Sequence, residues 1–265
     1  MNILEQTKLA KEASYETRNL SLEQRNGILQ RFKELLLENS TEVLAANSKD
    51  IEAATHLDQG MIDRLMLNQE RIEQIAAGID DVIALEDPLG IVLEDRDIPC
   101  GIHLKRVSVP LGVVGIIFES RPNVTADCFA LCLKSGNACI LKGGKESYES
   151  CFALVKQMKT ALAEFGVSEN AVMLCEKPTH EESQQLMEDR EHVDVLIPRG
   201  SKRLIQAVVE HSKVPVIETG AGICHAFVDK SADQDMALDI IVNGKCQRPS
   251  VCNALECVLV HKDIA

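Results

Sequence analysis

The stretch Gly112-Val113-Val114-Gly115-Ile116-Ile117-Phe118 begins a regular alternation of apolar runs and helical patterns. The later apolar runs cover residues 138–141, 171–175, 193–197 and 214–217, and the helical patterns cover 124–134, 148–165, 181–189 and 202–211. Apolar runs without polar alternation are typical of strands that are buried on both faces. The pattern therefore predicts an α/β fold in which a parallel sheet carries helices on both faces. Ligands of such sheets bind beyond the carboxyl ends of the strands.

The residues before this sheet show helical patterns. Ser21-Leu22-Glu23-Gln24 has the form of a capping box, and apolar residues follow it at helical spacing. Further helical patterns lie around residues 42–55 and 69–84. The segments Ile91-Val92-Leu93 and His103-Leu104-Lys105-Arg106-Val107 flank Pro99 and Gly101 and predict a β-hairpin.

Composition limits the classes of function. The chain has 265 residues, 45% of them hydrophobic, a formal net charge of -13 and no Trp. The acidic charge and the scarcity of aromatic residues argue against a surface for nucleic acids or anionic membranes. No apolar run approaches the roughly 20 residues that span a bilayer, and no N-terminal segment resembles a signal peptide. The ten cysteines form no Cys-x-x-Cys pair, so we expect reduced thiols, no metal site and a cytoplasmic location.

Two basic, glycine-containing turns follow strands of the predicted sheet. Lys142-Gly143-Gly144-Lys145 follows the second strand, and Arg199-Gly200-Ser201 follows the fourth. Glycines allow close approach of a ligand, and a helix N-terminus beside cations suits a phosphate. The alternative for each is an ordinary turn with solvated cations or a plain Ser201 N-cap. The segment Gly220-Ala221-Gly222 lacks the third glycine of a dinucleotide fingerprint, and strand rather than helix is expected after it.

A cysteine and an asparagine on two loops suggest chemistry on a carbonyl. Cys252 lies in the cationic loop Gln247–Asn253 before the apolar run 254–260, where a thiolate would be accessible and stabilised. Asn123 ends the matching loop Glu119-Ser120-Arg121-Pro122-Asn123. The alternatives without a catalytic role are that Cys252 is a small buried thiol and that Asn123 caps a helix. Glu218 is a candidate general base or a charged residue at a strand end.

These segments resemble a known family. The residues 109–115, 118–124, 140–146, 197–201 and 247–253 are similar to those of the gamma-glutamyl phosphate reductases, also called glutamate-5-semialdehyde dehydrogenases, a branch of the aldehyde dehydrogenase superfamily. The Arg-Pro-Asn and Arg-Pro-Ser-x-Cys-Asn elements carry the resemblance. It implies an aldehyde-dehydrogenase-like fold whose parallel-sheet cofactor domain binds NADPH without the usual glycine fingerprint.

The resemblance also implies roles for individual residues. Cys252 corresponds to the catalytic nucleophile, and Asn123 corresponds to the asparagine that stabilises an oxyanion. Lys142 corresponds to the lysine that contacts the adenosine ribose or its 2′-phosphate, and Gly200 and Ser201 correspond to the turn that holds the pyrophosphate. Arg121 and Arg248 are candidate holders of the substrate anions.

The resemblance implies two domains and a hairpin between parts of the first. Residues 1–92 and 110–219 would form the N-terminal helices and the NADP-binding domain, and residues 93–109 would form a hairpin of the oligomerisation type. Residues 220–265 would begin a second α/β catalytic domain. Family members continue beyond Ala265, so we expect the 265-residue polypeptide to bind NADPH weakly and to turn over poorly.

The implied reaction belongs to proline biosynthesis. L-Glutamyl 5-phosphate would be reduced by NADPH to L-glutamate 5-semialdehyde and phosphate through a cysteine thioester. Because phosphate is a good leaving group, the reaction does not require Glu218 as a base. A homo-oligomer and functional coupling to glutamate 5-kinase are also implied. Two other functions stay open, namely another acylating aldehyde dehydrogenase that uses coenzyme A and a non-catalytic cofactor-binding fragment.

Overall fold

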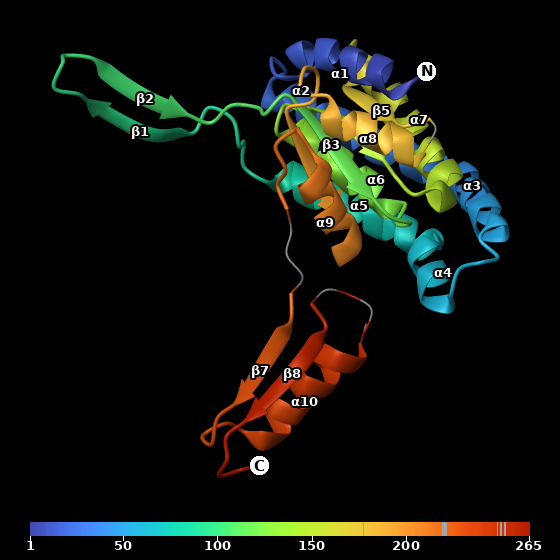
Figure 1. Cartoon of the computed structure of the whole chain (residues 1–265), viewed down its shortest axis with the longest axis vertical. Helices are drawn as coiled ribbons and strands as arrows, with labels where there is room; N and C mark the ends of the chain where they lie inside the picture. The colour runs from blue at the N-terminus through green and yellow to red at the C-terminus, as the bar shows by residue number, and fades with distance from the viewer. Residues whose placement is uncertain (177, 219–221, 248, 250, 252) are drawn as a thin grey trace. The chain divides into compact units, whose positions relative to one another are not determined.

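The computed structural model describes residues 1–265 except 177, 219–221, 248, 250 and 252 (Figure 1). The chain forms two compact units, Met1–Glu218 and Thr219–Ala265.

A four-stranded parallel sheet forms the centre of the larger unit. Its strands are β3 (Val113–Phe118), β4 (Ala138–Lys142), β5 (Val172–Leu174) and β6 (Val195–Arg199), in the order β5-β4-β3-β6. All six residues of β3 are buried, as expected for a central strand covered on both faces. The predicted parallel sheet is therefore confirmed.

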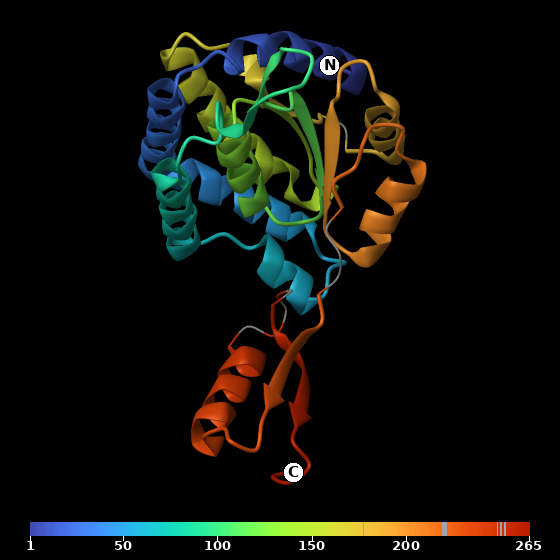
Figure 2. The same ribbon diagram turned by 90° about the vertical axis from the view of Figure 1, so that its left-hand side faces the viewer.

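Helices cover both faces of this sheet (Figure 2). Val114, Ile116 and Phe118 pack into a core with α2 (Leu22–Glu38), α5 (Gln69–Ala84), α6 (Asn123–Lys134) and α7 (Tyr148–Glu164). Val113 and Ile117 point the other way, into a core with α1 (Ile3–Thr17), α8 (His180–Glu188) and α9 (Lys202–His211). Alternate residues of one strand thus supply two cores, because successive side chains of a strand point to opposite faces.

The remaining elements of the larger unit complete the predicted N-terminal helices and hairpin. Helix α2 has the expected capping box between Ser21 and Gln24. Helices α3 (Ser40–Ala53) and α4 (Gln59–Leu65) and the short 3₁₀ turns η1 (Lys145–Ser147) and η2 (Glu169–Ala171) lie between the longer elements. The predicted hairpin forms from β1 (Val92–Asp97) and β2 (His103–Val107), which pair antiparallel.

The predicted strand 214–217 does not form as a strand. Val216 makes one isolated parallel bridge with Leu196, and the hydrogen bonds there are Leu196 N–H to Pro215 O and Ile217 N–H to Leu196 O. Pro215 has no N–H to donate, so it cannot extend the ladder. The strand predicted from the apolar run 214–217 was wrong, because an apolar pattern does not show that the proline lacks a backbone N–H donor.

The smaller unit is a β-α-β motif of two parallel strands joined by a helix. Its elements are β7 (Cys224–Val228), α10 (Gln234–Cys246) and β8 (Leu255–Val260). Strand β7 agrees with the expectation of strand rather than helix after Gly222, and β8 covers the apolar run before which Cys252 lies.

Gly112 occupies a position that other residues tolerate poorly. Its φ is +119°, and a Cβ added there would come within 2.2 Å of Asp194 Oδ2. Asp194 is fixed by the Val113 N–H at 2.8 Å and by Lys11 Nζ at 2.7 Å, which join the start of β3 to α1. Gly112 therefore needs both its unusual backbone conformation and its missing side chain.

Gly112→Ala is expected to destabilise the chain by about 3 kcal/mol, because it adds backbone strain to a steric clash. Thermal unfolding followed by circular dichroism measures the loss. Gly166→Ala is the matched control, since Gly166 has φ +69° but no atom within 4 Å of its added Cβ. We expect the control to lose about 1 kcal/mol; an equal loss in both variants would contradict this account of Gly112.

Candidate functional site

The loops after β3 and β6 lie next to each other at the carboxyl edge of the sheet. Phe118, the last residue of β3, pairs with Arg199, the last residue of β6. From β3 the chain continues to β4 and β5 on one side, while β6 adds on the other side. The edge between β3 and β6 is therefore the topological switch point, where open α/β sheets bind their ligands.

At this point Glu119 contacts the turn that follows β6. The Glu119 carboxylate accepts the Ser201 N–H at 3.0 Å and the Ser201 hydroxyl at 2.6 Å. A Cβ added to Gly200 would come within 2.7 Å of Glu119 Cδ, so glycine leaves room for this contact. Glu119 was not among the predicted site residues. Its signal in the sequence was its place directly after the central apolar strand.

Helix α9 presents a cationic N-terminus at the same edge. Ser201 is its N-cap, as one of the sequence interpretations required, and its Oγ accepts the Leu204 N–H at 3.3 Å. The N–H groups of Lys202 and Arg203 have no hydrogen-bond partner in the part of the chain that the structure describes. The first turn of α9 contains no acidic residue. Cations at the positive end of a helix dipole are unfavourable unless an anion binds beside them.

Lys142 ends β4 at the same edge of the sheet. The side chain is half-buried, and burial lowers the pKa of its ammonium group, although the nearby Cys175, Glu146 and Glu182 oppose this shift. A Cβ on Gly143 would meet the Phe118 ring at 3.2 Å. The predicted basic turn is thus tightly packed against β3, with Lys142 held inside it.

Asn123 is the first residue of α6 and is half-buried. Its Nδ2 donates to Asp127 Oδ2 at 3.3 Å, one turn along the helix. Desolvation of its carboxyl group raises the pKa of Asp127, even though part of the residue is exposed to solvent. The hydrogen bond from Asn123 and the positive charge of Arg199 oppose this shift. Asp127 therefore interacts with the loop after β3 and with the end of β6. The half-buried Arg121 belongs to the same loop, where its N–H donates to Glu119 O at 2.8 Å.

The structure does not place three further predicted residues at this edge of the sheet or leaves them undescribed. Cys252 and Arg248 lie outside the described residues, and Glu218 is exposed at the end of the larger unit. The structure therefore brings together Asn123, Gly200 and Ser201 and places Lys142 on the same edge of the sheet.

Several described cysteines are poor nucleophiles. Burial raises the pKa of Cys128 to about 12 and the pKa of Cys151 to about 11. A hydrogen bond with Cys132, together with burial, raises the pKa of Cys139 well above its ordinary value. At neutral pH these thiols remain protonated, so they behave as small apolar side chains.

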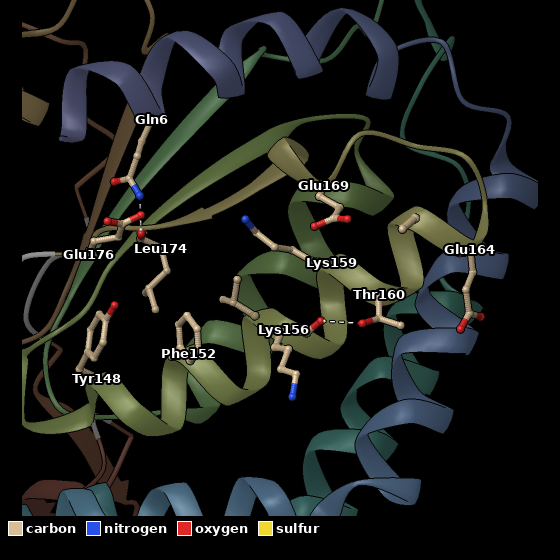
Figure 3. A pocket seen from close by; sticks show the side chains of 12 residues that line it. Gln6, Tyr148, Phe152, Lys156, Lys159, Thr160, Glu164, Glu169, Leu174 and Glu176 are labelled. Atoms are coloured by element: carbon tan, nitrogen blue, oxygen red, sulfur yellow. Dashed lines mark hydrogen bonds between the residues drawn. The ribbon is translucent and has the colours of Figure 1, made fainter. Parts of the chain in front are cut away.

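A separate pocket of about 630 Å³ lies along α7, with Leu174 of β5 also lining it (Figure 3). The stacked rings of Tyr148 and Phe152, with centroids 6.2 Å apart, form one wall, and Gln6 of α1 and Glu169 of η2 contribute on other sides. None of the predicted site residues lines it. The pocket is therefore distinct from the edge between β3 and β6.

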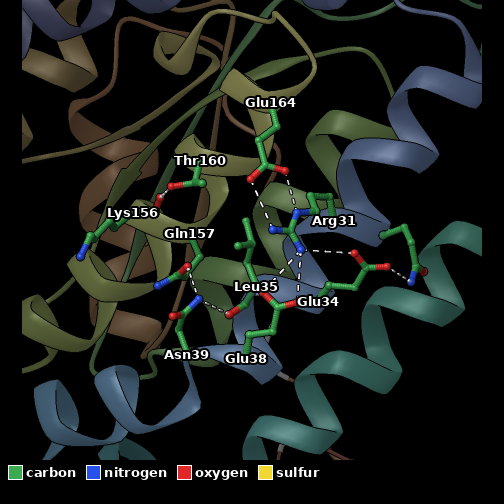
Figure 4. Close-up of polar contacts among 10 residues, drawn as sticks. Arg31, Glu34, Leu35, Glu38, Asn39, Lys156, Gln157, Thr160 and Glu164 are labelled. Atoms are coloured by element: carbon green, nitrogen blue, oxygen red, sulfur yellow. Dashed lines mark hydrogen bonds and ion pairs between the residues drawn. The ribbon is translucent and has the colours of Figure 1, made fainter.

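Some charged groups around this pocket are already paired. Lys156 binds Glu42 at 2.6 Å, and Glu164 binds Arg31 of α2 at 2.7 Å (Figure 4). Arg31 also reaches Glu34 and Glu38 at 3.4 Å. The Arg31–Glu164 pair joins α2 to α7 and the Lys156–Glu42 pair joins α3 to α7, so these charges have a structural role.

Among the described residues, none of the helices combines the length and the apolar character that a bilayer-spanning segment needs. No group of three or more His, Cys, Asp or Glu side chains is arranged to hold a metal ion in the same part of the chain.

Comparison with known families matches residues 2–265 to the aldehyde dehydrogenase family. This chain belongs to the aldehyde dehydrogenase family. Members of the family use nicotinamide cofactors, and the aldehyde-dehydrogenase-like fold predicted from the sequence is confirmed.

Relatives within the aldehyde dehydrogenase family agree with the resemblance seen in the motifs. Gamma-glutamyl phosphate reductase from Heliobacterium modesticaldum is 49% identical over 260 residues, which are 97% of this chain and 62% of that protein. The crystal structure of gamma-glutamyl phosphate reductase from Thermotoga maritima is 39% identical, with a TM-score of 0.91 over 100% of this chain and 64% of that one. The chain thus spans less than two thirds of the length of either relative.

A more distant solved structure shares the fold alone. An engineered glycolyl-CoA reductase with bound NADP⁺ is 21% identical, with a TM-score of 0.74 over 100% of this chain and 57% of that one.

Proposed function

We propose that this chain provides the cofactor-binding part and the nucleophile of an NADPH-dependent reductase. The reductase converts L-glutamyl 5-phosphate to L-glutamate 5-semialdehyde and phosphate, a step of proline biosynthesis. The observation that carries the proposal is the match of 97% of the chain, at 49% identity, to a gamma-glutamyl phosphate reductase. The cationic helix end at the switch point of the sheet supports it independently.

The residues at the carboxyl edge fit a nicotinamide dinucleotide. Gly200 and Ser201 precede α9, whose first turn carries Lys202 and Arg203; the N–H groups of these two residues have no hydrogen-bond partner among the described residues and suit a pyrophosphate. Lys142 is a half-buried cation on the same edge, suited to the adenosine ribose or its 2′-phosphate. Because Lys142 could pair with a 2′-phosphate, we propose that the site prefers NADPH to NADH. The distant glycolyl-CoA reductase, whose structure contains NADP⁺, offers an analogy.

Lys142→Met is expected to weaken NADPH binding about tenfold and NADH binding less than threefold, because only NADPH has a 2′-phosphate to pair with the ammonium group. Isothermal titration with both nucleotides measures the two changes. Lys145→Met is the matched control, since Lys145 is exposed two residues after Gly143. Equal losses for NADPH and NADH would contradict the proposed contact.

The chemistry begins with Cys252. Its thiolate attacks the acyl-phosphate carbonyl, so that a carbon–sulfur bond forms, the carbon–oxygen bond to phosphate breaks, and phosphate leaves with the electron pair. The Asn123 amide donates a hydrogen bond to the developing oxyanion, and Asp127 holds the other N–H of that amide. The nicotinamide cofactor, when bound, supplies the hydride that reduces the thioester. The carbon–sulfur bond of the reduced adduct then breaks, so that the semialdehyde leaves and the Cys252 thiolate is restored.

Other roles complete the proposal. Arg121 and Arg248 hold the carboxylate and phosphate of the substrate, since guanidinium groups bind such anions in a bidentate manner. Glu218 has no necessary role, because phosphate departure needs no activated water. The hairpin 93–109 serves a cytoplasmic homo-oligomer, and glutamate 5-kinase supplies the labile acyl phosphate. The proposed domains remain 1–92 with 110–219, and 220–265.

The reverse reaction tests the proposal against the coenzyme A alternative. Glutamate 5-semialdehyde is supplied with NADP⁺ and either inorganic phosphate or coenzyme A, and the formation of NADPH is followed by its absorbance. Formation that requires phosphate supports the proposed function. Formation that requires coenzyme A would replace it with an acyl-CoA reductase, and cofactor binding without turnover under either condition would favour a binding fragment.

A further inference from the structure

The contact between Glu119 and Ser201 places a carboxylate where an anionic ligand would bind. Glu119 is half-buried, and its two oxygens accept the Ser201 N–H at 3.0 Å and the Ser201 hydroxyl at 2.6 Å. Its side chain also passes within 2.7 Å of the Cβ position of Gly200. Glu119 therefore covers both residues proposed to hold the cofactor pyrophosphate.

The charges around this contact explain why a carboxylate is stable there. Helix α9 begins with Lys202 and Arg203, follows Arg199 of β6, and has no acidic residue in its first turn. An anion at this helix end is favoured by the helix dipole and the cations together. Glu119 supplies that anion from the neighbouring strand end, 82 residues earlier in the sequence.

We infer that Glu119 is an internal competitor of the cofactor, an inference that rests on the proposed role of Gly200 and Ser201. Without a ligand its carboxylate occupies the position of the cofactor pyrophosphate at the N-terminus of α9. Two anions cannot share one N–H group, so the cofactor binds only when the Glu119 side chain rotates away. The Glu119 residue thereby lowers the affinity for the dinucleotide and makes its release easier.

The size of the effect follows from the population of the open form. Apparent affinity falls in proportion to the fraction of molecules whose site is open, so a contact closed in nine of ten molecules weakens binding about tenfold. Glu119→Gln keeps the shape of the side chain but removes its charge, and Glu119→Ala removes the contact. We expect both variants to bind NADPH about tenfold more tightly than the parent, with Glu119→Ala the tighter of the two.

Glu210→Gln is the matched control. Glu210 is an exposed residue near the other end of α9, so this variant removes one negative charge without touching the Ser201 contact. Its NADPH affinity is expected to stay within about twofold of the parent, because exposed charges several turns away are screened by salt.

Two measurements test the inference. Titration with NADPH compares the parent with Glu119→Gln, Glu119→Ala and Glu210→Gln, and hydrogen exchange without nucleotide follows the peptide 199–204. Tighter binding in the Glu119 variants alone, with faster exchange of the Ser201 N–H in Glu119→Ala, supports the inference.

If the parent binds NADPH and the Glu119 variants bind equally or more weakly, Glu119 is not a competitor, although the proposed cofactor site stands. If Ser201 exchange is unchanged in Glu119→Ala, the contact is absent in solution and the inference fails. If none of the four proteins binds NADPH or NADH, the cofactor site itself is wrong and the inference fails with it.

Discussion

Iodoacetamide at pH 7 is expected to alkylate Cys252 at least about 300-fold faster than Cys151, because only the thiolate reacts. Burial raises the pKa of Cys151 to about 11, so that roughly one thiol in ten thousand is ionised at this pH. An ordinary exposed thiol is ionised to about 3%. Cys252 is expected to exceed that ordinary fraction, since its loop carries Arg248 four residues before it.

The measurement is a time course of alkylation read by mass spectrometry of peptides that contain single cysteines. Cys100 is the matched control, because it is exposed in the hairpin between β1 and β2. We expect Cys252 to react about tenfold faster than Cys100, as a thiolate stabilised by positive charge should. A Cys252 that reacts no faster than Cys100 would contradict its assignment as the nucleophile.

Asn123→Ala is expected to lower kcat about 100- to 1000-fold in the semialdehyde assay, the usual loss when one oxyanion donor is removed. The NADPH affinity should stay within about twofold, because the role proposed for Asn123 is at the reacting carbonyl and not at the cofactor. Steady-state kinetics and nucleotide titration of the same preparation give both numbers.

Asp127→Ala is the companion variant for this prediction. It removes the partner of Asn123 Nδ2 but leaves the amide, so a positioning role predicts a loss of about tenfold or less in kcat with unchanged NADPH affinity. A kcat of Asn123→Ala within fivefold of the parent would argue against oxyanion stabilisation, as would a parallel loss of NADPH affinity.

The sheet and its helices could be predicted from the sequence because their signals are local. Continuous apolar runs identified β3, β4, β5 and β6, and Ser21 with Gln24 identified the start of α2. The segment at Val216 failed because an apolar run does not reveal that Pro215 lacks the donor needed for a strand ladder.

The sequence predicted individual residues of the candidate site but not the contacts between them. Gly200 and Ser201 were found as a basic turn, and the N-cap role of Ser201 is confirmed. Glu119 was missed because its partner lies 82 residues away, and only the pairing of β3 with β6 brings the two loops together. The roles of Cys252, Arg248 and Asn123 remain predictions that come from the resemblance.

We propose that Cys252 carries the reduction of an acyl phosphate in an NADPH-dependent enzyme. The most direct measurement is phosphate-dependent NADP⁺ reduction by glutamate 5-semialdehyde in the parent and in Cys252→Ser. We expect a loss of at least about 1000-fold in turnover with NADPH affinity unchanged, because the variant loses the proposed nucleophile but keeps the proposed cofactor site. A Cys252→Ser protein that kept more than about a tenth of the parent turnover would show that Cys252 is not the nucleophile.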